Sequence, residues 1–282
     1  MPISTYNTLE NKQITDIKNL ISICNTYEAF KRSPVLQNEN LYQDMKSYYL
    51  YYEKTVLISV LIIDQLDFSE AEITGYTLPE CRRQGYFYEL LEEAMDELAD
   101  YNIFRILLVT EPNCISGTLT AKALADYEYS EYMLIHDLSE IDKKYINQNI
   151  QYKEVNKISD MNEQIVKQLA DNYETAKYAI ETENILYIEA YRNQEFVGIC
   201  NISLELDQGY LFGLYIVDEY RRQKIGYSFV NYMIERCIKA GKKGLTLQVG
   251  NNINALNLYL KLGFKVQEQL DYYVFYTEEE AD

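Results

Sequence analysis

Histidine and paired cysteines are scarce in this sequence, which has one histidine, His136, and five cysteines. A single histidine excludes a histidine-rich metal site. An odd number of cysteines without a Cys-x-x-Cys pair argues against a disulfide framework and against a zinc knuckle. Both observations fit reduced thiols in a reducing compartment. The cysteines are Cys24, Cys81, Cys114, Cys200 and Cys237.

Long apolar runs and a secretory signal are also lacking. The most continuous apolar run, Val56 to Ile63, has eight residues and contains Ser59, whereas a membrane helix needs about 20. The first ten residues are polar and lack the basic patch and apolar stretch of a secretory signal. We therefore expect a cytoplasmic protein without a membrane partner.

Basic residues are few, because 26 Lys and Arg stand against 44 Asp and Glu, giving a formal net charge of −18. This charge repels nucleic-acid phosphates and anionic membranes, so we expect no nucleic-acid partner. The same field raises the local concentration of cationic small molecules such as amines. A requirement for solubility would also explain the negative charge by itself.

The length of 282 residues allows two compact domains of about 140 residues each. The composition, 48% hydrophobic and 25% charged with 11 Gly and 4 Pro, is typical of a globular protein.

One pattern occurs twice. Leu78 to Phe87 and Val217 to Gly226 both contain Glu-x-Arg-Arg-Gln, and Arg221 stands 139 positions after Arg82. This separation is close to half the chain, which indicates duplication of a whole domain rather than a short solenoid repeat.

The flanks of the two copies repeat as well, in the order strand, turn, helix, strand, further helix and closing strand. A polar stretch, Ser139 to Asn149, separates them, so we expect domains over 1–140 and 150–282 in a mixed α/β fold. The predicted segments of the first domain are a helix over Ile14 to Phe30, a hairpin over Ser47 to Ile63, strands over Ala71 to Leu78 and Ile103 to Val109, and a closing strand over Tyr132 to His136. Those of the second are a helix over Met161 to Tyr173, a hairpin over Ile185 to Leu206, strands over Tyr210 to Val217 and Leu245 to Val249, and a closing strand over Tyr272 to Tyr276.

A strand that enters an Arg-Arg-Gln turn and then a helix is a physically sensible anion site, because the first helical turn has free backbone N–H groups and the positive end of the dipole. The segment Arg221 to Gly226 resembles motif A of the GNAT superfamily, Arg/Gln-x-x-Gly-x-Gly/Ala, which binds the pyrophosphate of acetyl-CoA. Its last small residue is present as Gly226, while Lys224 stands where the first glycine is expected.

A second GNAT signature, Asn-x-x-Ala-x-x-x-Tyr-x-x-x-Gly-Phe, is similar to the segment that follows. The matching residues are Asn252, Ala255, Tyr259, Gly263 and Phe264. Asn252 is placed to cap a short helix, Ala255 leaves room for a ligand, and Gly263 is placed to end the helix in the left-handed conformation.

This resemblance implies two tandem GNAT-like domains, each a central, mostly antiparallel sheet flanked by helices. It implies an N-acetyltransferase with acetyl-CoA as cosubstrate and no metal, in which the amine attacks the thioester directly. Tyr259 then stands at the position of the general acid. A phenol suits this role because it is protonated at neutral pH. The cofactor-binding positions it implies are Ile216, Val217, Arg221, Arg222, Gln223, Lys224, Ile225, Gly226, Tyr227, Asn252 and Ala255.

The first copy matches less well. Phe87 replaces the small residue that lets the pyrophosphate come close, and Lys122 stands opposite Tyr259. We therefore expect a degenerate first domain and a catalytic second one, with Arg82 to Gly85 still able to hold a CoA.

Several points stay open. Glu205, Asp207 and a water at Tyr210 are candidates for the general base, with Glu72 as the analogue in the first domain. The acceptor is a small-molecule amine or a peptide: polyamine, aminoglycoside, amino acid or protein N-terminus. The oligomeric state is not indicated. The alternatives are a non-catalytic CoA-binding or protein-interaction module, and a peptidyl-transferring relative that uses charged tRNA, which the net charge disfavours.

Overall fold

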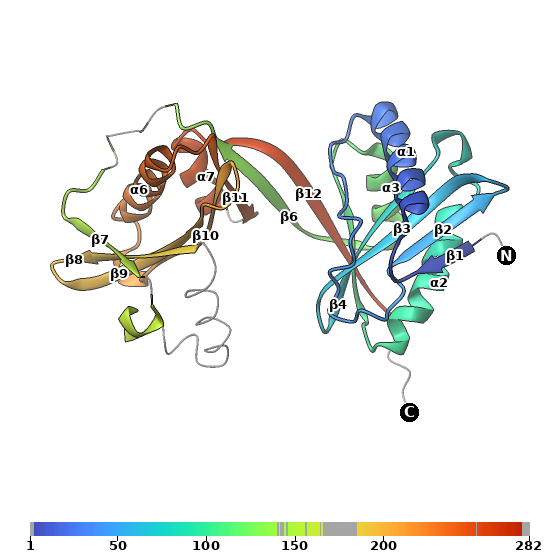
Figure 1. The fold of residues 1–282 in the computed structure, drawn as a ribbon, viewed down its shortest axis with the longest axis horizontal. Helices are drawn as coiled ribbons and strands as arrows, with labels where there is room; N and C mark the ends of the chain where they lie inside the picture. Colours follow the sequence, from blue (N-terminus) through green and yellow to red (C-terminus); the bar gives the residue numbers. More distant parts are fainter. Residues whose placement is uncertain are drawn as a thin grey trace. The chain divides into compact units, whose positions relative to one another are not determined.

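The computed structural model describes residues 3–139, 141, 144, 146–155, 157–163, 165, 185–251 and 253–277. The helix predicted over Met161 to Tyr173 lies largely outside the described residues, and Asn252 lies outside them as well. The chain forms two compact units (Figure 1): unit 1 comprises Met1–Glu131 and Glu268–Asp282, and unit 2 comprises Tyr132–Gln267.

Unit 1 has a mixed sheet in the strand order β1-β2-β3-β4-β5-β12. Neighbouring strands are antiparallel except β4 and β5, which are parallel. Its elements are β1 (Ile3–Tyr6), α1 (Asn11–Glu28), β2 (Tyr48–Glu53), β3 (Val56–Asp67), β4 (Glu70–Thr77), α2 (Tyr86–Asp100), β5 (Arg105–Thr110), α3 (Ile115–Leu124), the first half of β6 (Asp126–His136) and most of β12 (Lys265–Tyr276).

Unit 2 repeats this plan in the strand order β6-β11-β10-β9-β8-β7, with β10 and β11 parallel. Its further elements are β7 (Ile150–Val155), β8 (Ile185–Arg192), β9 (Glu195–Ser203), β10 (Gln208–Ile216), α6 (Ile225–Lys239), β11 (Gly244–Gly250) and α7 (Ile253–Lys261). Both predicted α/β units, with helices around a mixed sheet, are therefore confirmed.

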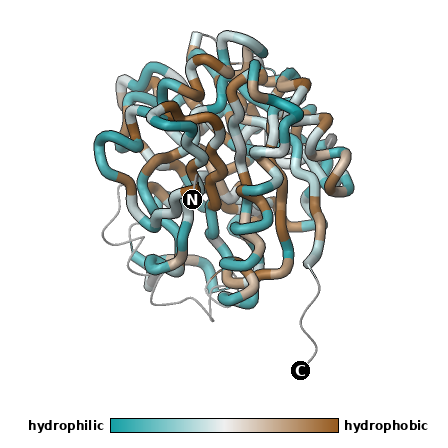
Figure 2. Tube along the Cα trace, turned by 90° about the vertical axis from the view of Figure 1, so that its right-hand side faces the viewer, coloured by the Kyte–Doolittle hydropathy of each residue, from teal (hydrophilic) through white to brown (hydrophobic). Residues whose placement is uncertain are grey.

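Each unit has its own apolar core. In unit 1 the buried stripe of α1, Ile17, Leu20, Ile21 and Cys24, has helical spacing and packs on one face of the sheet. Helix α2 packs its stripe on the other face. The fully buried Phe229 of α6 belongs to the core of unit 2. Apolar stretches, brown in Figure 2, run through the interior of the trace.

The closing strands are exchanged between the two halves of the sequence. Asp271 to Tyr276 pairs with Thr110 to Arg105 of β5 in unit 1, whereas Tyr132 to His136 belongs to unit 2, where β6 lies beside β11. The predicted assignment of these strands, and with it the ends of the spans 1–140 and 150–282, was wrong here. An alternating apolar pattern identifies a strand, but it does not identify the strand's partner.

No described helix combines the length and the apolar character that crossing a bilayer requires.

Candidate active site

Each unit contains a pair of parallel strands that separate partway along, which we call the strand divergence. In unit 1, β4 and β5 pair from Glu70↔Arg105 to Ile73↔Leu108. In unit 2, β10 and β11 pair over the four residues that end at Leu211↔Leu247. Among the described residues this pairing ends there, although β4 and β10 continue. The later backbone groups on that edge therefore face a gap in which they are available to a ligand.

Unit 2 has a β-bulge at its strand divergence. The register of β10 against β9 shifts between Phe212 and Tyr215, and Gly213 has a φ of +63°. The left-handed conformation favours glycine at this position, and a Cβ there would lie 2.7 Å from Nδ2 of Asn201, whose side chain would have to move. Over its last five residues β4 keeps an unbroken register with β3. The repeated sequence pattern did not predict the bulge, for which a glycine inside a strand is the sequence signal.

The turn after the divergence has the same shape in both units, as the repeated Arg-Arg-Gln predicts. Two residues of each turn have positive φ: Arg83 (62°) and Gly85 (95°) in unit 1, Arg222 (60°) and Lys224 (63°) in unit 2. The glycine position of the motif is thus a left-handed position, which Lys224 occupies at a cost of roughly 1 kcal/mol.

The first arginine of each turn holds the turn to its own strand. Nε of Arg221 donates to the carbonyl of Ile216 at 3.0 Å, and Nε of Arg82 donates to the carbonyl of Thr77 at 3.1 Å. The guanidinium of Arg221 also pairs with Asp218 at 2.8 Å and is half-exposed. Part of each arginine therefore serves to fix the turn.

Ile216 and Val217, two of the predicted cofactor-binding residues, differ in how their backbone N–H groups are used. The N–H of Val217 donates to the carbonyl of Val197 at 3.1 Å, so it is already used within the sheet. Because successive residues of a strand direct their N–H groups to opposite edges, the N–H of Ile216 is directed to the strand divergence. Of the pair, Ile216 alone has an amide suited to polarise a thioester carbonyl.

The remaining turn residues divide into surface and core. Arg222, Gln223 and Lys224 are exposed, and the amide of Gln223 is engaged by Arg192 at 2.6 Å and by the carbonyl of Glu219 at 3.0 Å. Ile225 is 1% exposed in the apolar core. Its side chain therefore packs, and only its backbone N–H, in the first turn of α6, faces the anion position.

Gly226 lies where α6 approaches α7. A Cβ at this position would meet Cδ1 of Leu258 at 2.9 Å, and Tyr227 beside it packs on the core. The small residue therefore lets α6 lie close to α7 and places no side chain over its own first turn. This geometry suits close approach of a phosphate to the backbone.

Tyr259 of α7 is 7% exposed and packs within the core of unit 2, with its ring 5.6 Å from that of Phe264. Burial raises the pKa of Tyr259 above its ordinary value of 10.0, and the electrostatic effect of the Cys200 thiol raises it further to a smaller extent. The phenol is therefore protonated at neutral pH, as a proton donor must be. Ala255, one turn earlier, is partly buried, and Gly263 has a φ of +91°, which confirms the left-handed helix end.

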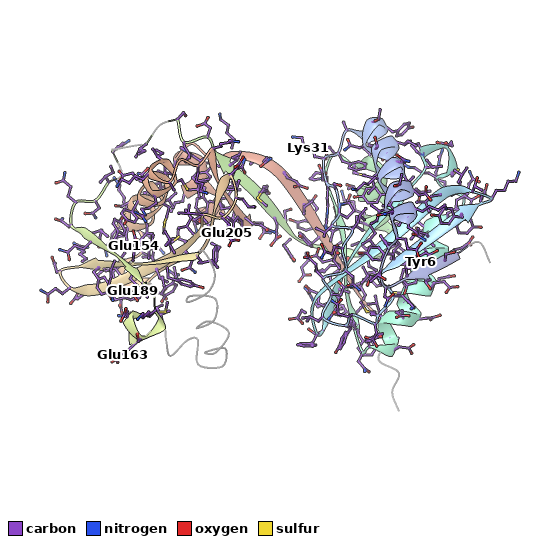
Figure 3. All side chains as sticks on the ribbon, viewed as in Figure 1. Tyr6, Lys31, Glu154, Glu163, Glu189 and Glu205 are labelled. Atoms are coloured by element: carbon purple, nitrogen blue, oxygen red, sulfur yellow. The ribbon has the colours of Figure 1, made fainter. Side chains whose placement is uncertain are left out.

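The suggested carboxylates lie far from the divergence. Asp207 precedes β10, whose open end at Ile216 is about 30 Å away at 3.3 Å per residue, and it forms an exposed ion pair with Lys243 at 2.6 Å. Glu205 is also exposed and, like Asp207, precedes the first residue of β10 (Figure 3). Neither is in position to take a proton from an amine at the divergence.

A carboxylate that the sequence reasoning missed is Glu189 of β8 (Figure 3), which is fully buried. It accepts a hydrogen bond from the hydroxyl of Tyr191 at 2.7 Å and lies 3.7 Å from Nζ of Lys153. Through the register Glu189↔Ile199 and Ile199↔Tyr215 it lies on the same sheet face as Tyr215.

Unit 1 contains a large cavity at its own strand divergence, with a volume of about 990 Å³. It is lined by both separating strands, by the turn Arg82 to Tyr88 and by the start of α3. The hydroxyl of Thr74, on β4, is buried there without a hydrogen-bond partner among the described residues. The unit judged degenerate from its motif thus retains the shape of a ligand site.

Phe87 does not simply obstruct this site, because its ring lies on the strand below it. A Cβ at Gly75 would lie 2.3 Å from the ring of Phe87. In unit 2 the equivalent pair is reversed: Leu214 on the strand packs against the core, and Gly226 is on the helix. A large and a small residue have therefore exchanged places between strand and helix.

We expect Phe87→Ala to lower the free energy of unfolding by about 2 kcal/mol, less than for a fully buried phenylalanine. Gly75→Leu alone is expected to overpack the same space. The double variant Gly75→Leu/Phe87→Ala should recover stability, giving a coupling energy of about 1 kcal/mol or more in urea unfolding. Strictly additive effects would contradict the exchange.

Comparisons with known proteins match this geometry. A sequence model of the Acetyltransferase (GNAT) family matches residues 152–264, all within unit 2. N-alpha-acetyltransferase 30 of Dictyostelium discoideum is 30% identical over 133 residues, which cover 44% of this chain and 71% of that protein.

Two solved structures resemble nearly the whole chain. A GCN5-related N-acetyltransferase from Sphaerobacter thermophilus has a TM-score of 0.75 at 12% identity, covering 98% of this chain and 96% of that one. A tandem GNAT protein from the clavulanic acid biosynthesis pathway has a TM-score of 0.62 at 10% identity, covering 99% and 100%. They confirm the predicted fold of two GNAT-like domains.

Proposed function

Because this chain belongs to the GNAT family of acetyltransferases, we propose that it transfers the acetyl group of acetyl-CoA to a primary amine, with unit 2 as the catalytic unit. The observation that carries this proposal is the convergence, in unit 2, of the strand divergence, the β-bulge at Gly213 and the open first turn of α6 at Gly226. The family match to residues 152–264 supports the choice of unit.

The residues of unit 2 divide the chemistry among them. Backbone N–H groups at the start of α6 bind the pyrophosphate, and the N–H of Ile216 polarises the thioester carbonyl. The amine nitrogen forms a bond to the carbonyl carbon, the carbon–sulfur bond breaks, and Tyr259 gives its proton to the departing thiolate. The ammonium form of the substrate first loses a proton to water or to a base, and no acyl-enzyme forms. After the new bond has formed, the nitrogen loses a second proton, which restores the phenol of Tyr259 directly or through water.

The acceptor is a cationic amine in this proposal. The net charge of −18 favours the approach of ammonium groups. The similarity to an N-alpha-acetyltransferase supports including a peptide N-terminus among the candidates, beside polyamine, aminoglycoside and amino acid.

The test is release of free CoA thiol from acetyl-CoA with this panel of amines. We expect amine-dependent release with at least one of them. Mass spectrometry should find the product about 42 Da heavier than the amine, because an acetyl group replaces one hydrogen. CoA binding by calorimetry without thiol release from any of the four classes would favour the alternative, a non-catalytic CoA-binding or protein-interaction module.

A further inference from the structure

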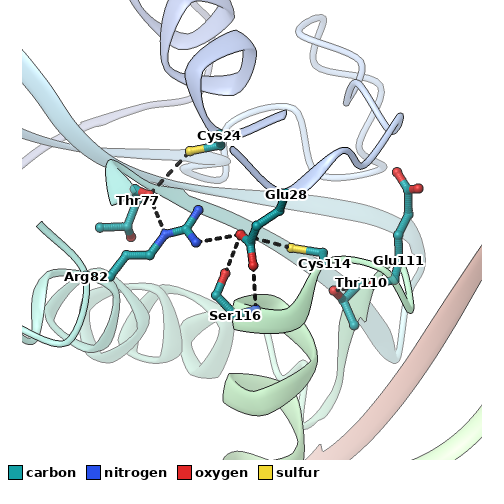
Figure 4. Close-up of polar contacts among 8 residues, drawn as sticks. All are labelled: Cys24, Glu28, Thr77, Arg82, Thr110, Glu111, Cys114 and Ser116. Atoms are coloured by element: carbon teal, nitrogen blue, oxygen red, sulfur yellow. Dashed lines mark hydrogen bonds and ion pairs between the residues drawn. The ribbon is translucent and has the colours of Figure 1, made fainter. Parts of the chain in front are cut away.

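The carboxylate of Glu28, at the end of α1, lies at the opening of the strand divergence in unit 1 (Figure 4). Its side chain is 8% exposed. It accepts hydrogen bonds from Nη1 of Arg82 at 2.5 Å, and from the backbone N–H and the hydroxyl of Ser116, both at 2.8 Å. One carboxylate thus takes four electropositive contacts if the thiol of Cys114, at 3.8 Å, is included.

These partners come from both sides of the divergence. Arg82 belongs to the turn that follows β4, whereas Ser116 is in the first turn of α3, which follows β5. The thiol of Cys24, one turn before Glu28, donates to the carbonyl of Thr77 at 3.3 Å, on the strand itself. The end of α1 therefore bridges the two walls of the cavity.

The groups that hold Glu28 are those that hold a phosphate: a guanidinium, a hydroxyl and a free N–H of a helix's first turn. Burial would raise the pKa of Glu28, but the hydrogen bonds from Ser116 and from Arg82 hold it below its ordinary value of 4.5. The carboxylate is therefore ionised at neutral pH, and it neutralises Arg82.

The equivalent arginine of unit 2 has different surroundings. The side chain of Arg221 is 55% exposed and pairs with Asp218 of its own turn, whose side chain is 78% exposed. Solvent reaches this pair, and such exposed pairs contribute little to stability. By contrast, the side chain of Arg82 is only 18% exposed.

We propose that Glu28 takes the place of a ligand phosphate in unit 1, so that the chain excludes CoA from this unit and binds one CoA, in unit 2. Without the carboxylate, Arg82 and the first turns of α2 and α3, which line the cavity of about 990 Å³, are left to bind the phosphates of a second CoA. The exclusion of CoA from unit 1 does not depend on what unit 2 does. The number of one CoA per chain rests on the proposed function, because that molecule binds unit 2.

The test is calorimetric titration of CoA into four full-length proteins: wild type, Glu28→Ser, Gly226→Glu and the double variant. The serine removes the charge and shortens the side chain, and Gly226→Glu blocks the site in unit 2. We expect one, two, zero and one CoA bound per chain, respectively. Glu92→Ser, which removes an exposed carboxylate from α2 of the same unit, is the matched control and should leave the count at one.

Two results would overturn the proposal: two CoA molecules bound to wild type, or no CoA bound to a double variant with an intact circular dichroism spectrum. If Glu28→Ser fails to fold, Glu28→Gln, which keeps the length of the side chain, carries the same expectation. Failure of the proposed function is distinguishable, because wild type would then bind none while Glu28→Ser still gained one.

Discussion

Gly226→Glu is expected to weaken CoA binding by about a hundredfold or more, since placing like charges together at a site costs several kcal/mol. The carboxylate would stand in the first turn of α6, where the N–H groups that bind the pyrophosphate converge. Equilibrium binding of CoA by calorimetry measures the effect, and circular dichroism verifies the fold.

Gly226→Ala is the matched control. It places the same Cβ against Cδ1 of Leu258, the end of a flexible side chain, without adding charge. We expect its affinity to remain within about fivefold of wild type, or about 1 kcal/mol. If the alanine variant loses as much affinity as the glutamate variant, packing of α6 against α7 and not repulsion of the pyrophosphate is the cause.

Tyr259→Phe is expected to lower turnover by about 10² to 10⁴, the usual contribution of a positioned acid. CoA affinity should stay nearly unchanged, because the ring and its contact with Phe264 survive. Only the hydroxyl is lost, and in the wild type burial keeps that group protonated across the neutral range. Steady-state thiol release and equilibrium CoA binding on one preparation give both quantities.

Tyr232→Phe controls for the loss of a hydroxyl elsewhere in the same unit. Tyr232 lies on α6, where it packs against the same core and stacks on Tyr152 at 4.2 Å between ring centroids. Its variant should keep full turnover. Undiminished turnover in Tyr259→Phe would make Tyr259 a packing residue and transfer the role of proton donor to water or to another tyrosine.

The sequence allowed prediction of the features that depend on local conformation. The strand, the Arg-Arg-Gln turn and the helix after it follow from apolar spacing and from residues tied to special backbone angles, and Gly263 ends its helix as expected. The predicted contact Asn252 lies outside the described residues, and the binding roles in the turn stay predictions.

Features that depend on distant partners could not be predicted. The bulge at Gly213 exists only relative to β9, and the side chain of Glu28 meets Ser116 across 88 positions of sequence. The exchange of Phe87 and Gly226 was visible as a substitution, but the contact of Phe87 with Gly75 was not, since it requires knowing which strand lies beneath the helix.

The exchange of closing strands has a consequence for biosynthesis. Asp271 pairs with Thr110 across 161 positions of sequence, so β5 stays an open edge until Asp271 to Tyr276 have left the ribosome. Translation at about 5 to 20 residues per second makes this a delay of roughly 10 to 30 seconds. Throughout that time the first half presents one unpaired edge of an apolar strand, the kind of edge that other chains can join. Unit 1 is therefore completed only after all of unit 2 has been synthesised, because the strand that closes its sheet follows unit 2 in the sequence.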